Sequence, residues 1–150
     1  MKHFFLTSAP IALFLALCAN VASASETGFT AFDCIEIESS IFEKEASGVG
    51  SSCALIGRKD NAESRAEDAL EADGQAECEA IRDGNPSFWD AYCQAVCEYN
   101  GYEDSNGPSM CSYVVTDTDT WEESGCFTGN RQYNRKEADV QCGCACSERL

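Results

Sequence analysis

The sequence predicts a small, disulfide-rich α+β single domain in which a helix is clamped onto an antiparallel sheet. Three observations lead to this prediction. Ten cysteines follow an N-terminal leader, two of them lie four residues apart on the clearest predicted helix, and three alternate along a predicted C-terminal strand. A cysteine content of this kind is typical of small secreted domains, because disulfides persist in oxidising compartments.

Residues 1–24 have the organisation of a secretory signal peptide. Lys2 and His3 form a short basic start, a mostly apolar stretch covers residues 4–21, and Ala22-Ser23-Ala24 supplies small residues for cleavage. Cleavage there would remove Cys18 and leave an even number of cysteines, as expected for a secreted protein without a free thiol. We therefore expect a signal peptide at residues 1–24 and one secreted, extracellular, disulfide-rich domain at residues 25–150.

The charge and the lack of histidine after the leader restrict the possible functions. Without Lys2, nine basic residues remain against 26 acidic ones, a net charge of −17. Such a surface disfavours nucleic acid and anionic membranes, which attract Lys and Arg, so we expect neither nucleic-acid binding nor membrane insertion. The single histidine, His3, lies in the leader. Histidine-dependent nucleophilic and metal sites are therefore disfavoured, and we expect no enzyme, no metal and no cofactor.

The first part of the mature chain gives weak structural signals. Residues 29–37 are rich in β-branched and aromatic side chains and predict a strand held by Cys34. Residues 39–46 predict a short helix, and the Gly/Ser-rich residues 47–52 a loop. Residues 58–82 are rich in Ala and Glu and predict a helix with only a faint apolar stripe. We expect that helix to be weakly anchored, so that residues 57–75 form a mobile or even processed segment.

The clearest helix covers residues 86–100. Asn85 is a good N-cap, Pro86 suits the first helical position, and Asn100-Gly101 is a strong stop signal. Six residues share one face at helical spacing and are expected in the core: Phe88, Trp89, Tyr92, Cys93, Val96 and Cys97.

After a predicted turn at Asn106-Gly107-Pro108, the sequence favours strands at residues 110–116, 126–128 and 140–146. Together these segments predict a small antiparallel sheet at the end of the chain.

Two of the predicted bridges follow from spacing. Cys93 and Cys97 project from one side of the helix about 6 Å apart, and alternate cysteines of Cys142-Gly-Cys-Ala-Cys146 share a sheet face about 6.6 Å apart. Two adjacent bridges can therefore clamp the helix to this strand, while Gly143 and Ala145 suit close backbone approach on the other face. The remaining connectivity stays open. The ten cysteines expected in disulfides are Cys34, Cys53, Cys78, Cys93, Cys97, Cys111, Cys126, Cys142, Cys144 and Cys146.

The C-x-x-x-C helix and the C-x-C strand resemble the cysteine-stabilised α/β motif of defensins and scorpion toxins. The resemblance covers five cysteines, and the chain departs from that family in length, in its acidity and in the third alternating cysteine. In format, the chain as a whole resembles the small cysteine-rich proteins that fungi and similar organisms export as host-directed effectors. That resemblance implies an apoplastic or extracellular protein that acts by binding a host protein, by shielding a ligand or by being recognised by host surveillance. We expect a monomer with a host protein or receptor as its partner.

Two alternative functions remain open. A protease inhibitor would present a disulfide-braced loop, for which residues 117–125 between Cys111 and Cys126 are the candidate. A carbohydrate-binding protein, or a glycoside hydrolase that uses two carboxylates, would place aromatic residues in a groove and bind a polysaccharide. The candidates for stacking on sugars are Trp89, Trp121, Tyr113 and Tyr133. A basic cluster that could contact an acidic partner contains Arg131, Tyr133, Arg135 and Lys136. We therefore take Trp121, Arg131 and Tyr133 as the candidate binding surface.

Overall fold

A computed structural model describes residues 33–127 and 129–149, without the side chains of residues 148–149. Its elements, in chain order, are β1 (Asp33–Glu36), β2 (Glu43–Ser52), α1 (Arg58–Glu79), the 3-10 helix η1 (Ala80–Arg82), α2 (Pro86–Tyr99), β3 (Tyr102–Cys126) and β4 (Gly129–Arg149). Two helices pack on an antiparallel four-stranded sheet, so the predicted fold class is confirmed.

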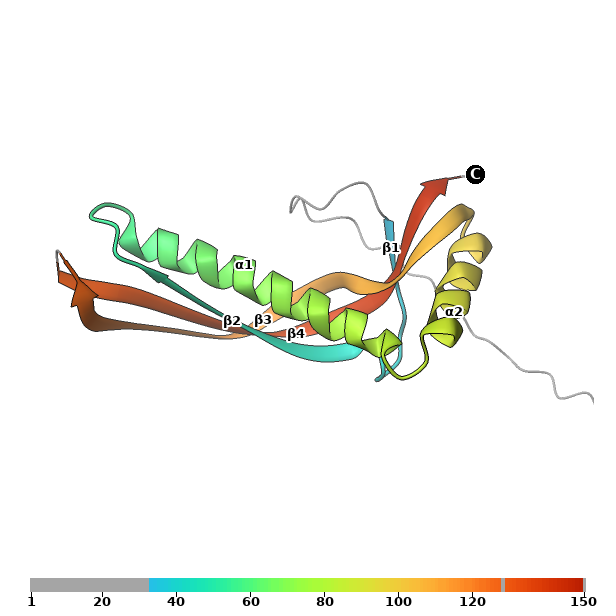
Figure 1. Ribbon diagram of the computed structural model, residues 1–150, viewed down its shortest axis with the longest axis horizontal. Coiled ribbons are helices and arrows are strands. Elements are labelled where there is room, and N and C mark those ends of the chain that lie inside the picture. The colour runs from blue at the N-terminus through green and yellow to red at the C-terminus, as the bar shows by residue number, and fades with distance from the viewer. Residues whose placement is uncertain (1–32, 128, 150) are drawn as a thin grey trace, which may run out of the picture.

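β3 and β4 form a long antiparallel hairpin that runs along the molecule (Figure 1). β4 is the central strand: β3 pairs with one of its edges, and β1 and β2 lie one after the other along the opposite edge. β2 opposes residues 132–141 and β1 opposes residues 143–146. The molecule is elongated, with α2 and β1 at one end and the turn of the hairpin at the other.

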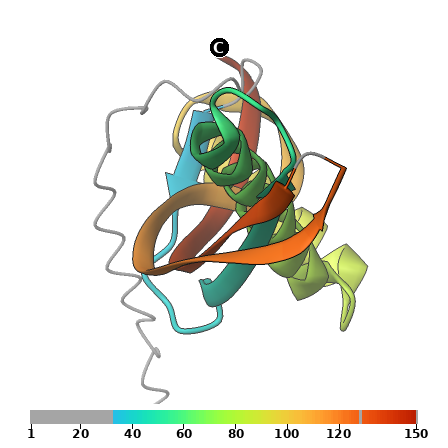
Figure 2. The same cartoon turned by 90° about the vertical axis from the view of Figure 1, so that its left-hand side faces the viewer.

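Helix α1 runs along the hairpin over β2 and β4 (Figures 1 and 2). Its buried residues recur every four positions and form one stripe: Ala62, Ala66, Leu70, Gly74 and Cys78. Gly48 and Gly50 of β2 lie under this stripe, and a Cβ on either would stand 2.1 Å from a helix carbonyl oxygen. The helix therefore rests almost directly on the strand backbone, and the expectation that it is weakly anchored is wrong.

Helix α2 begins and ends as predicted. The Asn85 side chain accepts a hydrogen bond from the Phe88 N–H at 3.3 Å, and Asn100 is the C-cap. Its core face is confirmed for Cys93, Val96 and Cys97, which are buried, whereas Phe88 is 53% exposed. The predicted clamp is also confirmed, because Cys93 is bonded to Cys144 and Cys97 to Cys146.

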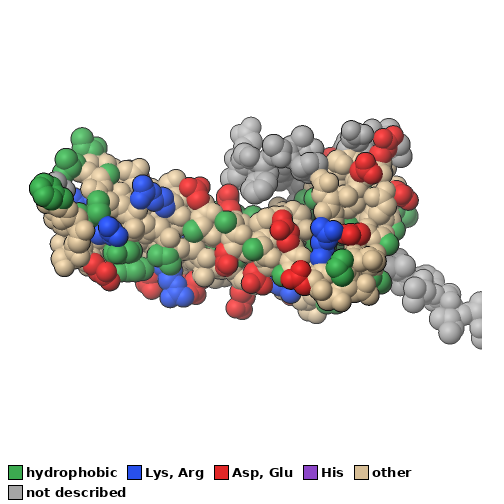
Figure 3. All heavy atoms as spheres, viewed as in Figure 1, with side chains coloured by type: hydrophobic (Ala, Val, Ile, Leu, Met, Phe, Trp, Pro, Cys, Tyr) green, Lys and Arg blue, Asp and Glu red, His purple; other side chains and the backbone are tan. Residues whose placement is uncertain are grey.

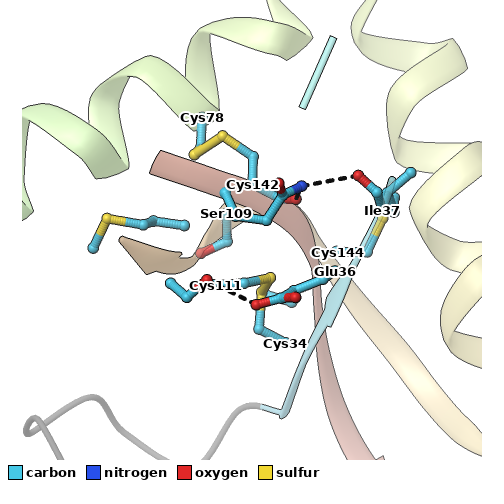
Figure 4. The surroundings of a disulfide bond; sticks show 12 residues. Cys34, Glu36, Ile37, Cys78, Ser109, Cys111, Cys142 and Cys144 are labelled. Atoms are coloured by element: carbon cyan, nitrogen blue, oxygen red, sulfur yellow. Dashed lines mark hydrogen bonds between the residues drawn. A yellow bond between two sulfur atoms is a disulfide. The ribbon is translucent and has the colours of Figure 1, made fainter. Parts of the chain in front are cut away.

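Three further disulfides complete the set. They join Cys78 to Cys142, Cys34 to Cys111 and Cys53 to Cys126. The Cys34–Cys111 bridge links β1 to β3, the two strands that flank β4 (Figure 4). It passes over Gly143, where a Cβ would stand 2.5 Å from the Cys111 sulfur. The expected role of Gly143 in close backbone approach is thereby confirmed, since a Cβ there would also lie 2.1 Å from the Ile35 carbonyl oxygen.

The prediction for residues 39–52 is wrong. The short helix at residues 39–46 and the loop at 47–52 are replaced by a turn and strand β2. Burial alternates along β2, with Ala46, Gly48, Gly50 and Ser52 facing α1. Glycine is a poor strand former on its own, but here its missing side chain admits the helix.

The predicted strand boundaries also differ from the structure. The turn expected at Asn106-Gly107-Pro108 lies inside β3, at a register shift between Ser105 and Gly107, and Gly107 has a φ of 86°. Residues 117–125, expected as a loop, continue β3: residues 117–124 pair with β4, and Gly125 lies at a register shift. Of the strand predicted at residues 29–37, the structure describes β1, and residues 29–32 lie outside the described part.

The apolar core occupies the end of the molecule near α2. Phe42, Leu70, Ile81 and Val140 are buried there together with half-buried Trp89 and Tyr92. Toward the turn of the hairpin, the β4 residues beneath α1 are instead the buried polar residues Gln132, Asn134 and Lys136. The end of α1 near α2 therefore packs on apolar side chains, whereas the end near the turn of the hairpin packs on polar ones.

Candidate functional site at the tip of the hairpin

Two loops meet at the end of the molecule farthest from α2. One is the loop of residues 53–57 between β2 and α1, and the other is the turn between β3 and β4 (Figure 1). Cys53 of the first is bonded to Cys126, the last residue of β3. We call these two loops the tip.

Arginine side chains fix the backbone of the tip. Arg58 donates from Nε to the Ala54 carbonyl oxygen at 3.1 Å and from Nη1 to the Asn130 carbonyl oxygen at 2.6 Å. Arg131 donates from Nε to the Cys53 sulfur at 3.4 Å. These bonds and the Cys53–Cys126 disulfide therefore connect the loop of residues 53–57 to the ends of β3 and β4.

The tip exposes large apolar side chains. Leu55 is 76% exposed, Ile56 is 89% exposed, and Phe127 is as exposed as in an extended chain. Hydrophobic side chains gather at this end of the surface, at the left of Figure 3. An exposed apolar group of this kind marks an interaction site more often than it serves stability, since its burial would be favourable only against a partner.

The three residues of the predicted binding surface lie side by side next to the tip. Trp121 of β3 opposes Tyr133 of β4, and their rings stack with centroids 5.1 Å apart and planes 2° apart. The next pair on the same face toward the tip is Glu123 with Arg131. All three belong to the face of the sheet opposite α1, which we call the open face.

The stacking leaves a limited surface for a sugar. One face of each ring is taken by the other ring, and the Trp121 indole N–H donates to Glu123 at 3.2 Å. The pair therefore adds a rigid, half-exposed aromatic ledge to the tip.

A buried cation lies under α1 behind this ledge. The Lys136 side chain is 8% exposed, and its ammonium group donates to Glu63 at 3.0 Å and to Glu67. Burial lowers the pKa of Lys136, but the hydrogen bonds and charges of Glu67 and Glu63 outweigh it and raise that pKa above its usual 10.5. Lys136, which the sequence places in a basic cluster that could contact an acidic partner, is therefore not available to one.

The expectation that residues 117–125 form the loop of a protease inhibitor is wrong, because these residues belong to strand β3. The braced loops are instead those of the tip. Sequence analysis missed Leu55, Ile56 and Phe127, although an apolar pair between Cys53 and a helix start at Gly57 was a usable signal. The exposure of these side chains follows only from the tertiary structure.

Two further features of the described residues bear on function. They contain no group of three or more His, Cys, Asp or Glu side chains placed to hold a metal ion. No helix in residues 33–127 or 129–149 is long and apolar enough to cross a membrane.

No protein-family model matches the chain, and comparison with curated proteins and with solved structures gave no match.

Proposed function

We propose that this protein is a secreted, host-directed effector that binds an extracellular protein of the host through its tip. Five disulfides make it a small, covalently stabilised domain suited to an extracellular setting. The observation that carries the proposal is the exposure of Leu55, Ile56 and Phe127 beside the Cys53–Cys126 disulfide, which joins the two sides of the tip.

The disulfide matters because bracing a loop lowers the cost of binding. Ordering a rotamer-rich side chain or a loop at an interface costs free energy, and a braced loop has already lost most of that freedom. The tip can thus insert its apolar residues into a pocket of the partner, with the ledge of Trp121 and Tyr133 beside it. Central aromatic and aliphatic anchors of this kind typically supply most of the affinity of an interface.

The test compares two variants of the secreted protein. In the tip variant, Leu55→Ser, Ile56→Ser and Phe127→Ser remove the apolar anchors. In the matched control, Ile41→Ser and Tyr99→Ser remove exposed apolar side chains that are 49% and 77% exposed and lie outside the tip. Each protein is immobilised, and extracellular fluid of candidate hosts is passed over it, with bound proteins quantified by mass spectrometry.

We expect a protein captured by the wild type and the control to be lost from the tip variant. Equal capture by both variants would contradict a tip-mediated function.

A protease inhibitor is a second candidate. The observation that favours it is the joining of two loops by Cys53–Cys126 at one end of an elongated molecule, a shape that fits into a concave cleft. Incubation with a panel of extracellular proteases tests it. An inhibitor slows one protease in proportion to its concentration and keeps both tip loops uncut, whereas cleavage without inhibition would eliminate this candidate.

A further inference from the structure

Side chains of the two helices form hydrogen bonds with the outward backbone groups of some stretches of the sheet edges and leave other stretches uncovered. On the free edge of β2, the Ser47 N–H donates to Asp73 at 2.9 Å and the Ser51 carbonyl oxygen accepts from Arg65 at 2.6 Å. Both partners are side chains of α1, so the helix covers this edge as well as one face of the strand. Covering an edge in this way prevents another strand from pairing with it.

The first part of β3 is covered in the same manner. Gln94 of α2 donates to the Glu103 carbonyl oxygen at 2.8 Å and accepts from the Ser105 N–H at 3.2 Å. Gln75 of α1 accepts from the Met110 N–H at 3.0 Å. These amide side chains occupy the positions that a neighbouring strand would take.

Beyond Met110 the cover ends. Met110 opposes Cys142 of β4 and points its N–H away from β4. Residues that oppose the even-numbered residues of β4 from Val140 to Gln132 share this orientation, because backbone groups alternate along a strand. They are Tyr113, Val115, Thr118, Thr120 and Glu122. Among the described residues, the only hydrogen-bond partner of their outward backbone groups is Asp117, whose side chain accepts from the Thr118 N–H at 2.9 Å.

This open stretch has the composition of a good strand. Residues 114–120 are all exposed, and Val114, Val115 and three alternate threonines at 116, 118 and 120 are β-branched. Val114 is 69% exposed and Val115 is 40% exposed. An exposed edge with high β-propensity is a template for the addition of a further strand.

Charge decides which strand fits. Asp117, Asp119 and Glu122 lie on this stretch. The charged residues that line a hollow beside its start are Glu43, Glu45, Glu77 and Asp139, with Lys44 as the one cation. A second copy of the chain would set these carboxylates against each other. Like charges directly opposite one another on paired strands are destabilising, whereas opposite charges are favourable.

We propose that the edge of β3 from Tyr113 to Glu122 binds an extended segment of the partner protein with Lys or Arg at alternate positions. The segment pairs with the outward backbone groups of β3, and its basic side chains lie over Asp117 and Asp119 on the open face. A ten-residue strand of this kind is about 34 Å long. This inference rests on the proposed binding function and adds the chemistry of the partner.

The experiment uses two synthetic peptides with the full mature protein. The probe is an acetylated ten-residue peptide in which Lys and Val alternate, and its control has the same composition with five Lys followed by five Val. We expect the alternating peptide to bind at least tenfold more tightly by fluorescence anisotropy. Amide hydrogen exchange should then slow at Val115, Thr120 and Glu122. Equal binding of the two peptides, or unchanged exchange at these amides, would overturn the proposal.

Two variants separate the backbone contribution from the charge contribution. Thr120→Pro removes one outward N–H at an edge position where proline is tolerated, and should weaken the probe at least tenfold. Asp117→Asn with Asp119→Asn leaves the backbone intact and should weaken it at least threefold, with a smaller dependence on salt. Unchanged peptide affinity in both variants would contradict the proposal. A wild-type dimer that Thr120→Pro converts to a monomer would also contradict it, because the edge would then bind a second copy of the chain.

The tip variant distinguishes this proposal from the proposed function. It should bind the alternating peptide as the wild type does, because Leu55, Ile56 and Phe127 lie outside the edge. Loss of host-protein capture by the tip variant together with failure of the peptide experiment would refute the strand addition alone. The reverse result would refute the role of the tip.

Discussion

Ala66 of α1 lies directly over Gly48 of β2. A Cβ on Gly48 would stand 2.1 Å from the Ala66 carbonyl oxygen and 2.3 Å from the Leu70 nitrogen. Both atoms belong to the helix backbone and cannot rotate away. The contact therefore sets the distance between α1 and β2. It also explains why a glycine, which in the sequence suggests a loop, lies in a strand beneath the small-residue stripe of α1.

We predict that Gly48→Ala destabilises the protein by about 3 kcal/mol or more, because the helix must move off the strand to admit one methyl group. Urea unfolding with the disulfides intact measures this change. Gly84→Ala is the control, since a Cβ there meets nothing within 4 Å and should change stability by less than about 0.5 kcal/mol. Similar midpoints for the two variants would contradict the close contact.

The ion pairs of Lys136 should respond unequally to the removal of each partner. Lys136→Met leaves Glu63 and Glu67, whose side chains are 53% and 46% exposed, free to be solvated. Glu63→Gln with Glu67→Gln instead leaves a buried ammonium group without a counter-charge, which typically costs about 3–5 kcal/mol. We expect the double glutamine variant to be the less stable of the two in urea unfolding. The opposite order would mean that the ammonium group is well solvated in the folded state.

The sequence predicts those parts of the fold that depend on local chemistry. Helix α2 could be predicted because Asn85, Pro86 and Asn100 act within one turn of the helix ends. The two clamp bridges could be predicted because a helix and a strand each have a fixed repeat that places alternate or fourth residues on one side.

The remaining features depend on tertiary contacts. β2 contains Gly48 and Gly50, whose local preference is for a loop, and only the approach of Ala62 and Ala66 gives glycine an advantage there. Residues 117–124 extend β3 because β4 supplies a partner for each of them. In the candidate site, Trp121, Arg131 and Tyr133 could be found by composition. The exposure of Leu55, Ile56 and Phe127 depends on which loops the Cys53–Cys126 bridge brings together.

The five disulfides should differ in their access to a reductant. Cys53, Cys126, Cys34 and Cys111 are partly exposed, whereas the six cysteines of the other three bridges are at most 1% exposed. Thiol–disulfide exchange requires a thiolate to reach a sulfur atom, so access sets the order of reduction. We predict that mild dithiothreitol treatment of the native protein, followed by alkylation and peptide mapping, labels these four cysteines first. Early labelling of Cys93 or Cys97 would contradict the buried clamp.

Two buried amide oxygens should lower the stability of the polar end of the contact between α1 and β4. Gln132 Oε1 and Asn134 Oδ1 are buried without a hydrogen-bond partner among the described atoms. A buried unpaired polar atom typically costs about 1–3 kcal/mol, and an apolar residue of similar size avoids that cost. Asn134→Leu should therefore leave stability unchanged or raise it, while Asn134→Ala lowers it by leaving a void. A large loss of stability in Asn134→Leu alone would show that the amide is needed at this position.

Alkaline solution should destabilise the fold through two groups. Burial, followed by the charge of Glu71 and a hydrogen bond to its carboxylate, raises the pKa of Tyr113 above its usual 10.0. Lys136 also has a raised pKa, as its pairing with Glu67 and Glu63 requires. A raised folded-state pKa means that the folded state holds its proton more tightly than the unfolded chain does. Both contributions are thus fully present below pH 10 and are lost as the pH rises through each folded-state pKa.

Urea midpoints measured from pH 8 to pH 12 test this dependence. We expect the wild-type midpoint to fall above about pH 10. Tyr113→Phe and Lys136→Met should each make the fall shallower, because neither replacement has a proton to lose in this range. In a titration followed at 295 nm, Tyr113→Phe should also remove a tyrosine whose pKa lies above the usual 10.0. A wild-type decline unchanged in both variants would place the alkaline sensitivity elsewhere in the protein.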